Sequence, residues 1–446
     1  MINSDKQYLF YILLHILLGV LIFYVPSLSK VYGYGSLFVG SYIVLKNRNQ
    51  NHEALYVAGY IVGSEVFLRM TEGNPVYEFS KYGVMLFIFM GMYFKAFSKY
   101  ALPYWIFLAL LVPGLIVAAY SLNYDTEMRK TLSFNISGPV CLGVASLYTY
   151  YRRITIREFN NILLCVGMPV ITCAVYLMLY TPNIRDVITG TGSNFETSGG
   201  FGPNQVSTIL GLGMFIFLSR VLFNSKTKLI LFINLIIALV IGYRGLVTFS
   251  RGGMITSVVI LIVLIFATYS RINSRGRTKL NIAFVFFVLT LFAVWSYSAA
   301  ETGGLIEKRY ANQDAAGRVK SSQFTGRETI VKSEIEFFLS HPIFGVGVAK
   351  GAELRRDQTG LIILSHNEIS RMLAEHGSFG IMALLILFFT PLFLYLDNKD
   401  HIFLLSCLIF WLLTINHAAM RIAAPSFIYA LSLLKVSTDE EPSVHR

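Results

Sequence analysis

The chain has 446 residues, of which 55% are hydrophobic and 14% are charged, and its formal net charge is +12. Soluble domains carry about 25% charged residues, so this composition excludes a soluble globular protein and predicts a polytopic membrane protein. The positive charge does not indicate nucleic-acid binding, because the basic residues flank the hydrophobic segments.

Apolar segments of roughly membrane-spanning length recur along the whole chain. We identify fourteen: 8–27, 31–46, 54–70, 79–97, 100–120, 132–151, 160–180, 203–222, 228–249, 252–269, 279–299, 366–395, 402–416 and 421–435. The segments 31–46, 402–416 and 421–435 are the shortest or most polar of them. The four cysteines all lie in apolar segments, so we expect no disulfide framework. The sequence therefore predicts an all-α protein with about 12–14 transmembrane helices.

The loops between these segments predict an orientation. Leaving out the long segment 300–365, the short loops and termini hold 18 Lys and Arg residues on one side and 8 on the other. Because basic loops stay in the cytoplasm, we expect both termini to be cytoplasmic. This orientation places residues 181–202 and 300–365 outside. It divides the chain into N-terminal spans (1–180), spans with buried arginines (181–299), a large external loop (300–365) and C-terminal spans with a tail (366–446).

Two arginines, Arg244 and Arg251, lie seven residues apart at the end of the apolar run 229–249. An arginine deep in a bilayer costs about 2.5–3.5 kcal/mol and normally faces a cavity or a partner. Seven residues is close to two helical turns, so we expect both cations on roughly one face, suited to a lipid phosphate or pyrophosphate. The alternative for Arg244 is a carboxylate partner or a surface position.

Two glycine-containing segments open spans on the same predicted face. Residues 199–205 (GGFGPNQ) are either a turn with Asn204 capping a helix or part of a substrate groove. Residues 250–253 (SRGG) are a tight hinge whose glycines allow backbone amides to approach an anion.

The external loop has internal order. The pattern of residues 327–339 predicts a short helix that ends at His341 and Pro342, and a glycine-rich turn follows at 345–351. The next span opens with His366, and Ser365 is a plausible N-cap.

A dense polar face follows His366. Glu368, Arg371 and Glu375 have helical i,i+3 and i,i+4 spacing, so they can satisfy one another as ion pairs. His366 has no such charged neighbour, and it is either a structural residue or a general base at the mouth of the span. No Walker loop, dinucleotide fingerprint or cluster of metal ligands occurs in the sequence, which argues against an ATP-driven pump and a redox enzyme.

Three motifs in this order resemble the O-antigen ligase and polymerase superfamily. They are 249–254 (FSRGGM), 326–328 (GRE) with 340–347 (SHPIFGVG), and 365–377 (SHNEISRMLAEHG). The resemblance extends over about 195–395. It implies a helical bundle of the C-type glycosyltransferases, independent of metals and cofactors, that moves glycans from undecaprenyl pyrophosphate at the outer face of the bacterial inner membrane.

By this resemblance, Arg251, Arg327 and His366 are functional positions. We expect Arg251 and Arg327 to bind the pyrophosphate with Arg244 as deeper support, and His366 to be the base or to orient the acceptor, with Glu368 as a second candidate base. Asn204, Asn367 and Arg371 are candidates for the substrate groove.

The acceptor implied is lipid A core, a second lipid-linked glycan, or a protein hydroxyl. A flippase for lipid-linked oligosaccharides is the alternative from another class. It is disfavoured because the sequence contains no internal repeat.

Overall fold

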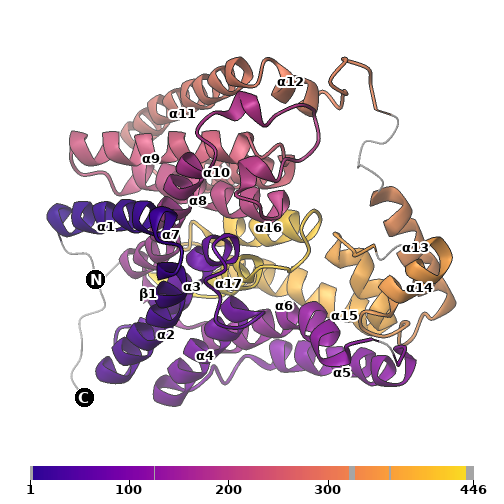
Figure 1. The fold of residues 1–446 in the computed structure, drawn as a ribbon. Helices are drawn as coiled ribbons and strands as arrows, with labels where there is room; N and C mark the ends of the chain where they lie inside the picture. The colour runs from indigo at the N-terminus through magenta and orange to yellow at the C-terminus, as the bar shows by residue number, and fades with distance from the viewer. Residues whose placement is uncertain (1–3, 125, 321–326, 361–362, 438–446) are drawn as a thin grey trace, which may run out of the picture.

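The computed structural model describes residues 4–124, 126–320, 327–360 and 363–437, and the side chain of Arg327 lies outside the described part. The fold is a helical bundle with a small parallel sheet (Figure 1). The helices are α1 (Asp5–Tyr24), α2 (Leu28–Asn47), α3 (Glu53–Met70), α4 (Phe79–Lys95), α5 (Leu102–Ser121), α6 (Met128–Thr149), α7 (Ile156–Tyr180), α8 (Pro203–Phe223), α9 (Lys228–Leu246), α10 (Arg251–Tyr269), α11 (Ser274–Glu301), α12 (Leu305–Tyr310), α13 (Arg327–Ser340), α14 (Lys350–Thr359), α15 (Glu368–Asp397), α16 (Leu404–Ile415) and α17 (Ala423–Leu431). The strands are β1 (Arg153–Thr155) and β2 (Lys435–Ser437), and short 3-10 turns lie at Ile184–Asp186 and Glu196–Ser198.

Each of the fourteen predicted apolar segments coincides with one helix. Among the described residues, eight helices are long and apolar enough to cross a membrane: α1, α5, α7, α8, α9, α10, α11 and α15. The helices α16 and α17 have only 12 and 9 residues. At 1.5 Å per residue neither can cross a hydrocarbon core of about 30 Å alone. The segments 402–416 and 421–435 are therefore a hairpin of short helices, and the total of 12–14 spans stays a prediction.

The parallel pairing of β1 with β2 defines one end of the bundle, which we call the strand end. Asn398, just after α15, bonds Leu434 and Val436, so the C-terminal end of α15 lies there too. The opposite end, which we call the loop end, holds α12, α13, α14 and the N-termini of α8, α10 and α15 (Figure 1). This arrangement gathers the sequence motifs at one end of the molecule.

Close backbone contacts hold the bundle together. A Cβ on Gly63 of α3 would lie 2.0 Å from the carbonyl oxygen of Val166 on α7, so only glycine allows this crossing. One apolar core includes buried residues of α3, α7 and α8. A second apolar core joins α5, α6, α15, α16 and α17, and its largest fully buried side chain is Trp411. The two cores fix the helices that lead to the loop end.

The predicted orientation can be tested by cysteine labelling. We expect a cysteine at Val319, which is 75% exposed at the loop end, to react with an impermeant maleimide from outside intact cells, in a background without the native cysteines. A cysteine at the exposed Lys226, between α8 and α9 at the strand end, should react only after the inner membrane is permeabilised. The reverse pattern would overturn the orientation.

Candidate functional site

The starts of α8 and α10 are joined at the loop end by hydroxyl and amide side chains. Ser250 donates to the Asn204 Oδ1 atom over 2.8 Å, and Ser207 donates to the Ser250 hydroxyl over 3.0 Å. The N-cap of α8 is Gly202, with Pro203 in the first turn, so Asn204 is not the cap. Asn204 instead fixes the turn that leads into Arg251.

The two glycines after Arg251 allow α10 to approach both of its neighbours. A Cβ on Gly253 would lie 2.2 Å from the Ser207 carbonyl oxygen. A Cβ on Gly252 would lie 2.5 Å from the ring of His417. The two glycines of the SRGG segment are therefore required by packing, one against His417 and the other against α8.

Arg244 and Arg251 do not share one helix. The helix α9 ends at Leu246 and α10 begins at Arg251. Between them Phe249 has a φ of 58°, a left-handed conformation that breaks the helix. The expectation that both arginines lie on one helical face is wrong, because it assumed a continuous helix through a reversal of the chain.

Arg244 is buried and bonded to the backbone of the preceding loop. Its Nη1 atom donates to the carbonyl of Thr181 over 3.2 Å, and its Nη2 atom donates to the carbonyl of Thr197 over 3.3 Å. Arg244 therefore ties the segment 181–197 to the end of α9. Its predicted role in supporting the pyrophosphate stays a prediction.

Arg251 lies beside a second arginine that the sequence did not single out. Its Nη1 atom donates to the carbonyl of Arg309 over 3.3 Å, and the Arg309 Nε atom donates back to the carbonyl of Phe249 over 2.9 Å. Arg309 also donates to the Ser193 hydroxyl. These reciprocal bonds hold α12 against the turn before α10.

A third cation, Lys320, belongs to the same group. Its pKa is lowered, first by partial burial and then by the neighbouring positive charges of Arg309 and Arg251. Lys320 therefore lies near enough to Arg309 and Arg251 to feel their charges. We call Arg251, Arg309 and Lys320 the cation cluster. Near it α10 presents its N-terminus, where backbone amides also favour an anion.

His366 lies in a turn just before α15, and its side chain is half-buried. The N-cap of α15 is Asn367, whose Oδ1 atom accepts from the amides of Ile369 and Ser370 over 2.9 and 3.2 Å. The prediction of Ser365 as the cap was therefore wrong by two residues. This cap fixes the start of α15 and with it the position of the preceding residue, His366.

The loop between α16 and α17, residues 416–422, connects the His366 turn to the Arg251 turn, and we call it the tip loop. The amide of Ala419 donates to the carbonyl of His366 over 3.1 Å, and Arg421 donates to the carbonyl of Ser365. On its other side His417 bonds the hydroxyl of Thr208 on α8 over 3.2 Å and packs on Gly252. The tip loop therefore touches both halves of the candidate site.

Sequence reasoning missed the tip loop. The available signal was a polar stretch, with Asn416, His417 and Arg421, between two apolar segments that are too short to cross a membrane. Asn416 accepts from the Asn367 side chain over 3.2 Å, which joins a predicted groove residue to the missed loop.

A buried network of charged residues on α3 and at the start of α4 holds the start of α17, directly after the tip loop. The Glu65 carboxylate accepts from the amide of Ala423, the first residue of α17, over 2.6 Å, and it also pairs with Arg69. Glu78 pairs with both Arg69 and Lys81, over 3.4 and 2.7 Å. Two acids and two bases balance one another here, so the network positions α17 without adding net charge beside the cation cluster.

Arg371 is paired as the spacing predicted. It donates from Nε to Glu368 over 3.1 Å and from Nη1 to Glu375 over 2.5 Å. Both oxygens of Glu368 bond Arg371, and Glu368 is 1% exposed. This geometry makes the trio an internal ion-pair set of α15.

Glu334 of α13 fastens the external segment to the His366 turn. It accepts from Ser365 over 3.2 Å, from Ser370 over 2.6 Å and from the Arg355 guanidinium over 3.2 Å. Burial raises the pKa of the Glu334 carboxyl, and the bond from Ser370 and the charge of Arg355 offset this only in part.

Arg327 begins α13, but its side chain lies outside the described residues, so its predicted role stays a prediction.

We expect Glu334→Ala to destabilise the protein by about 3–5 kcal/mol, because it leaves the 5%-exposed Arg355 without its acidic partner. Glu334→Gln should cost less, since the amide oxygen still accepts from the two serines. Thermal unfolding of the detergent-purified variants measures both. Glu336→Ala on the same helix, which removes an exposed carboxylate, is the control. Equal melting temperatures for wild type and Glu334→Ala would contradict the assignment.

The sequence comparison covers part of this arrangement. Residues 236–385 match the protein-family model described as O-Antigen ligase. The match includes the Arg251 turn, α12, α13, α14 and the His366 turn. A comparison with curated proteins found no match. Residues 236–385 are therefore an O-antigen ligase domain within a multi-pass membrane protein.

Proposed function

We propose that the protein transfers a glycan from an undecaprenyl-pyrophosphate carrier to an acceptor hydroxyl at the periplasmic face of the bacterial inner membrane. The acceptor is lipid A core, as in a ligase, or a second lipid-linked glycan, as in a polymerase. The reaction inverts the anomeric carbon and needs no metal ion. The observation that carries the proposal is the cation cluster beside the N-terminus of α10.

The cation cluster matches the chemistry of the leaving group. When the bond between the anomeric carbon and the pyrophosphate oxygen breaks, negative charge accumulates on the pyrophosphate. Arg251, Arg309 and Lys320 can stabilise that charge where it develops, as a divalent cation does in other transferases. Fixed guanidinium groups need no reorganisation during the step. In this proposal Arg327 adds a further cation from the start of α13, and Arg244 acts only by holding the segment 181–197.

The His366 turn supplies the other half of the reaction. The acceptor oxygen attacks the anomeric carbon from the face opposite the pyrophosphate, and its proton passes to the His366 imidazole. Glu368 is a poorer base because both of its oxygens bond Arg371. Asn204 and Asn367 lie at the starts of α8 and α15 and are suited to contact sugar hydroxyls, whereas Arg371 is committed to its acidic partners.

The test is a reconstituted transfer assay. Purified protein is incubated with an undecaprenyl-pyrophosphate glycan and, in separate arms, with lipid A core, with more donor, or with a serine-containing acceptor protein. We expect a product in one of the first two arms, with unchanged yield in EDTA. A product in the protein arm alone would reassign the acceptor. Movement of the donor across vesicles without any product would support a flippase instead.

A further inference from the structure

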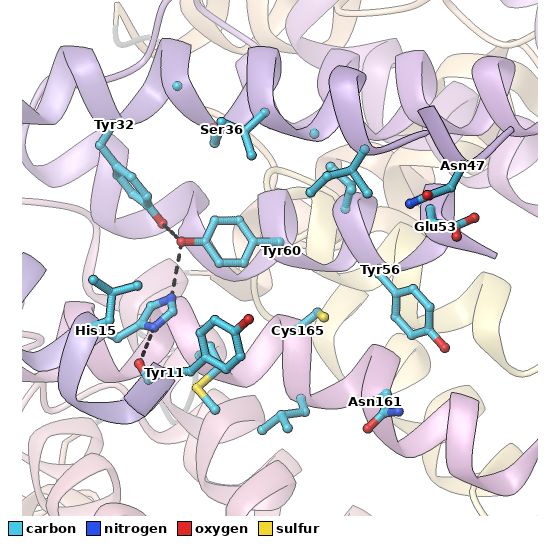
Figure 2. Close-up of a pocket in the computed structure, with 18 of the residues that line it drawn as sticks. Tyr11, His15, Tyr32, Ser36, Asn47, Glu53, Tyr56, Tyr60, Asn161 and Cys165 are labelled. Carbon is cyan, nitrogen blue, oxygen red and sulfur yellow. Dashed lines mark hydrogen bonds between the residues drawn. The ribbon is translucent and has the colours of Figure 1, made fainter. Parts of the chain in front are cut away.

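An elongated cavity of about 670 Å³ lies between α1, α2, α3 and α7, away from the transfer site (Figure 2). Its lining extends along α2 from Tyr32 to Asn47, which at 1.5 Å per residue is about 22 Å. This length exceeds one leaflet of a hydrocarbon core of about 30 Å, so the cavity is long enough for an acyl chain. One end of the cavity, formed by Asn47, Glu53 and Asn161, lies at the strand end, where α2 ends and α3 and α7 begin.

The other end of the cavity, which we call the inner end, is formed by Tyr32, Tyr60 and His15. Its polar groups already have partners. Tyr32 donates to the Tyr60 hydroxyl over 3.1 Å, and that hydroxyl lies 3.2 Å from the Nε2 atom of His15 (Figure 2). The His15 Nδ1 atom lies 2.7 Å from the carbonyl of Tyr11, which can only accept, so Nδ1 carries a hydrogen. A neutral ring then accepts at Nε2 from Tyr60. Because these three hydrogen bonds already pair the polar groups of Tyr32, Tyr60 and His15, an apolar group can lie at the inner end without leaving one of them unpaired.

The end formed by Asn47, Glu53 and Asn161, which we call the outer end, contains polar groups without partners. The Tyr56 hydroxyl and the Asn161 amide nitrogen are buried without a hydrogen-bond partner, and both line the cavity. Among the residues described at the cavity, Glu53 is the one carboxylate, and it accepts from Asn51. The Asn161 nitrogen and the Tyr56 hydroxyl can donate to a ligand oxygen, whereas the buried Glu53 carboxylate favours a positively charged donor. A ligand with a net negative charge and no cationic group would be repelled by Glu53.

The mouth of the cavity is apolar. The lining residues Tyr11 and Leu14 on α1 are 39% and 44% exposed, and Val39 on α2 is 59% exposed. These side chains face the surroundings of the bundle, which in a membrane are lipid chains. A ligand can therefore enter sideways from the bilayer.

We propose that this cavity is a binding site for a zwitterionic phospholipid with an ammonium head group. One acyl chain lies along α2 toward His15, and the ammonium group donates to Glu53, with the Asn47 and Asn161 side chains beside it. The site is separate from the cation cluster in both place and charge preference, because the cation cluster lies at the loop end and attracts anions. Bound lipid fills the space between α1 and α2 and stabilises their positions.

The test compares lipids on the purified full-length protein by native mass spectrometry and thermal unfolding. We expect phosphatidylethanolamine to bind on the order of ten times more tightly than phosphatidylglycerol or undecaprenyl phosphate, as one charge-assisted contact predicts, and to raise the melting temperature. Glu53→Gln should remove most of this preference while the acyl chain still binds. Equal binding of the three lipids to the wild type, or no binding, would overturn the proposal.

A cavity-filling variant locates the bound chain. Gly35 lines the cavity and a Cβ there meets no atom within 4 Å, so Gly35→Phe starts its side chain in open space. We expect this variant to fold and to lose phosphatidylethanolamine binding. The control is Val31→Phe, at a 65%-exposed position of the same helix outside the lining, which should bind as the wild type does. A photoreactive acyl chain should label α2 or α7 near Cys165 in the wild type and in Val31→Phe only. Binding that persists in Gly35→Phe, or labelling elsewhere, would contradict the site.

Discussion

Arg251→Ala is expected to reduce glycan transfer by at least about 10²–10³-fold while the protein remains folded in the membrane. Removing one fixed donor from a developing oxyanion typically has an effect of this size. Arg327→Ala should behave in the same way if that side chain joins the cation cluster. The measurement is turnover per folded molecule in the reconstituted assay, with thermal unfolding as the check on folding.

Lysine at position 251 should restore little activity, because an ammonium group cannot make the paired, planar contacts of a guanidinium with phosphate. Arg185→Ala is the matched control. Arg185 is a cation near the end of α11 whose exposed side chain pairs with Glu301. Near-normal turnover of Arg251→Lys, or an equal loss in Arg185→Ala, would remove the main support for pyrophosphate binding by the cation cluster.

The parts of the structure that the sequence predicts are those set by local spacing. The ion pairs of Arg371 with Glu368 and Glu375 follow from neighbouring turns of one helix, and the structure confirms them. The short helix before His341 is also confirmed, as α13 ends at Ser340. Apolar segments were found in full because hydrophobicity over one span is likewise a local property.

The parts that could not be predicted depend on contacts between distant segments. Arg309 meets Arg251 across 58 residues, and Arg421 meets Ser365 across 56. The residues around Arg309 and around Arg421 contain no pattern that indicates which distant segment each arginine contacts. The break at Phe249 was missed for another reason, because a left-handed φ at a phenylalanine has no signature in an apolar run. It separated Arg244 from Arg251 and gave Arg244 backbone carbonyls as partners.

His366→Ala is expected to lower turnover by about 10²–10⁴-fold, the usual effect of losing a general acid or base. Donor binding should survive, because the cation cluster lies on α10, α12 and the segment after α12, and not on the His366 turn. The prediction therefore separates two quantities, turnover and affinity for the lipid-linked donor. His341→Ala is the control, since it removes an exposed histidine of the same external segment.

The alternative is that His366 only shapes the start of α15. Its carbonyl accepts from Ala419 through the backbone, and that bond persists in His366→Ala. A purely structural side chain would therefore lower the melting temperature and leave turnover per folded molecule intact. Measuring both quantities on one purified sample decides between the two roles. Full specific activity at a reduced melting temperature would exclude His366 as the base, whereas lost turnover at an unchanged melting temperature and donor affinity would place it at the reacting hydroxyl.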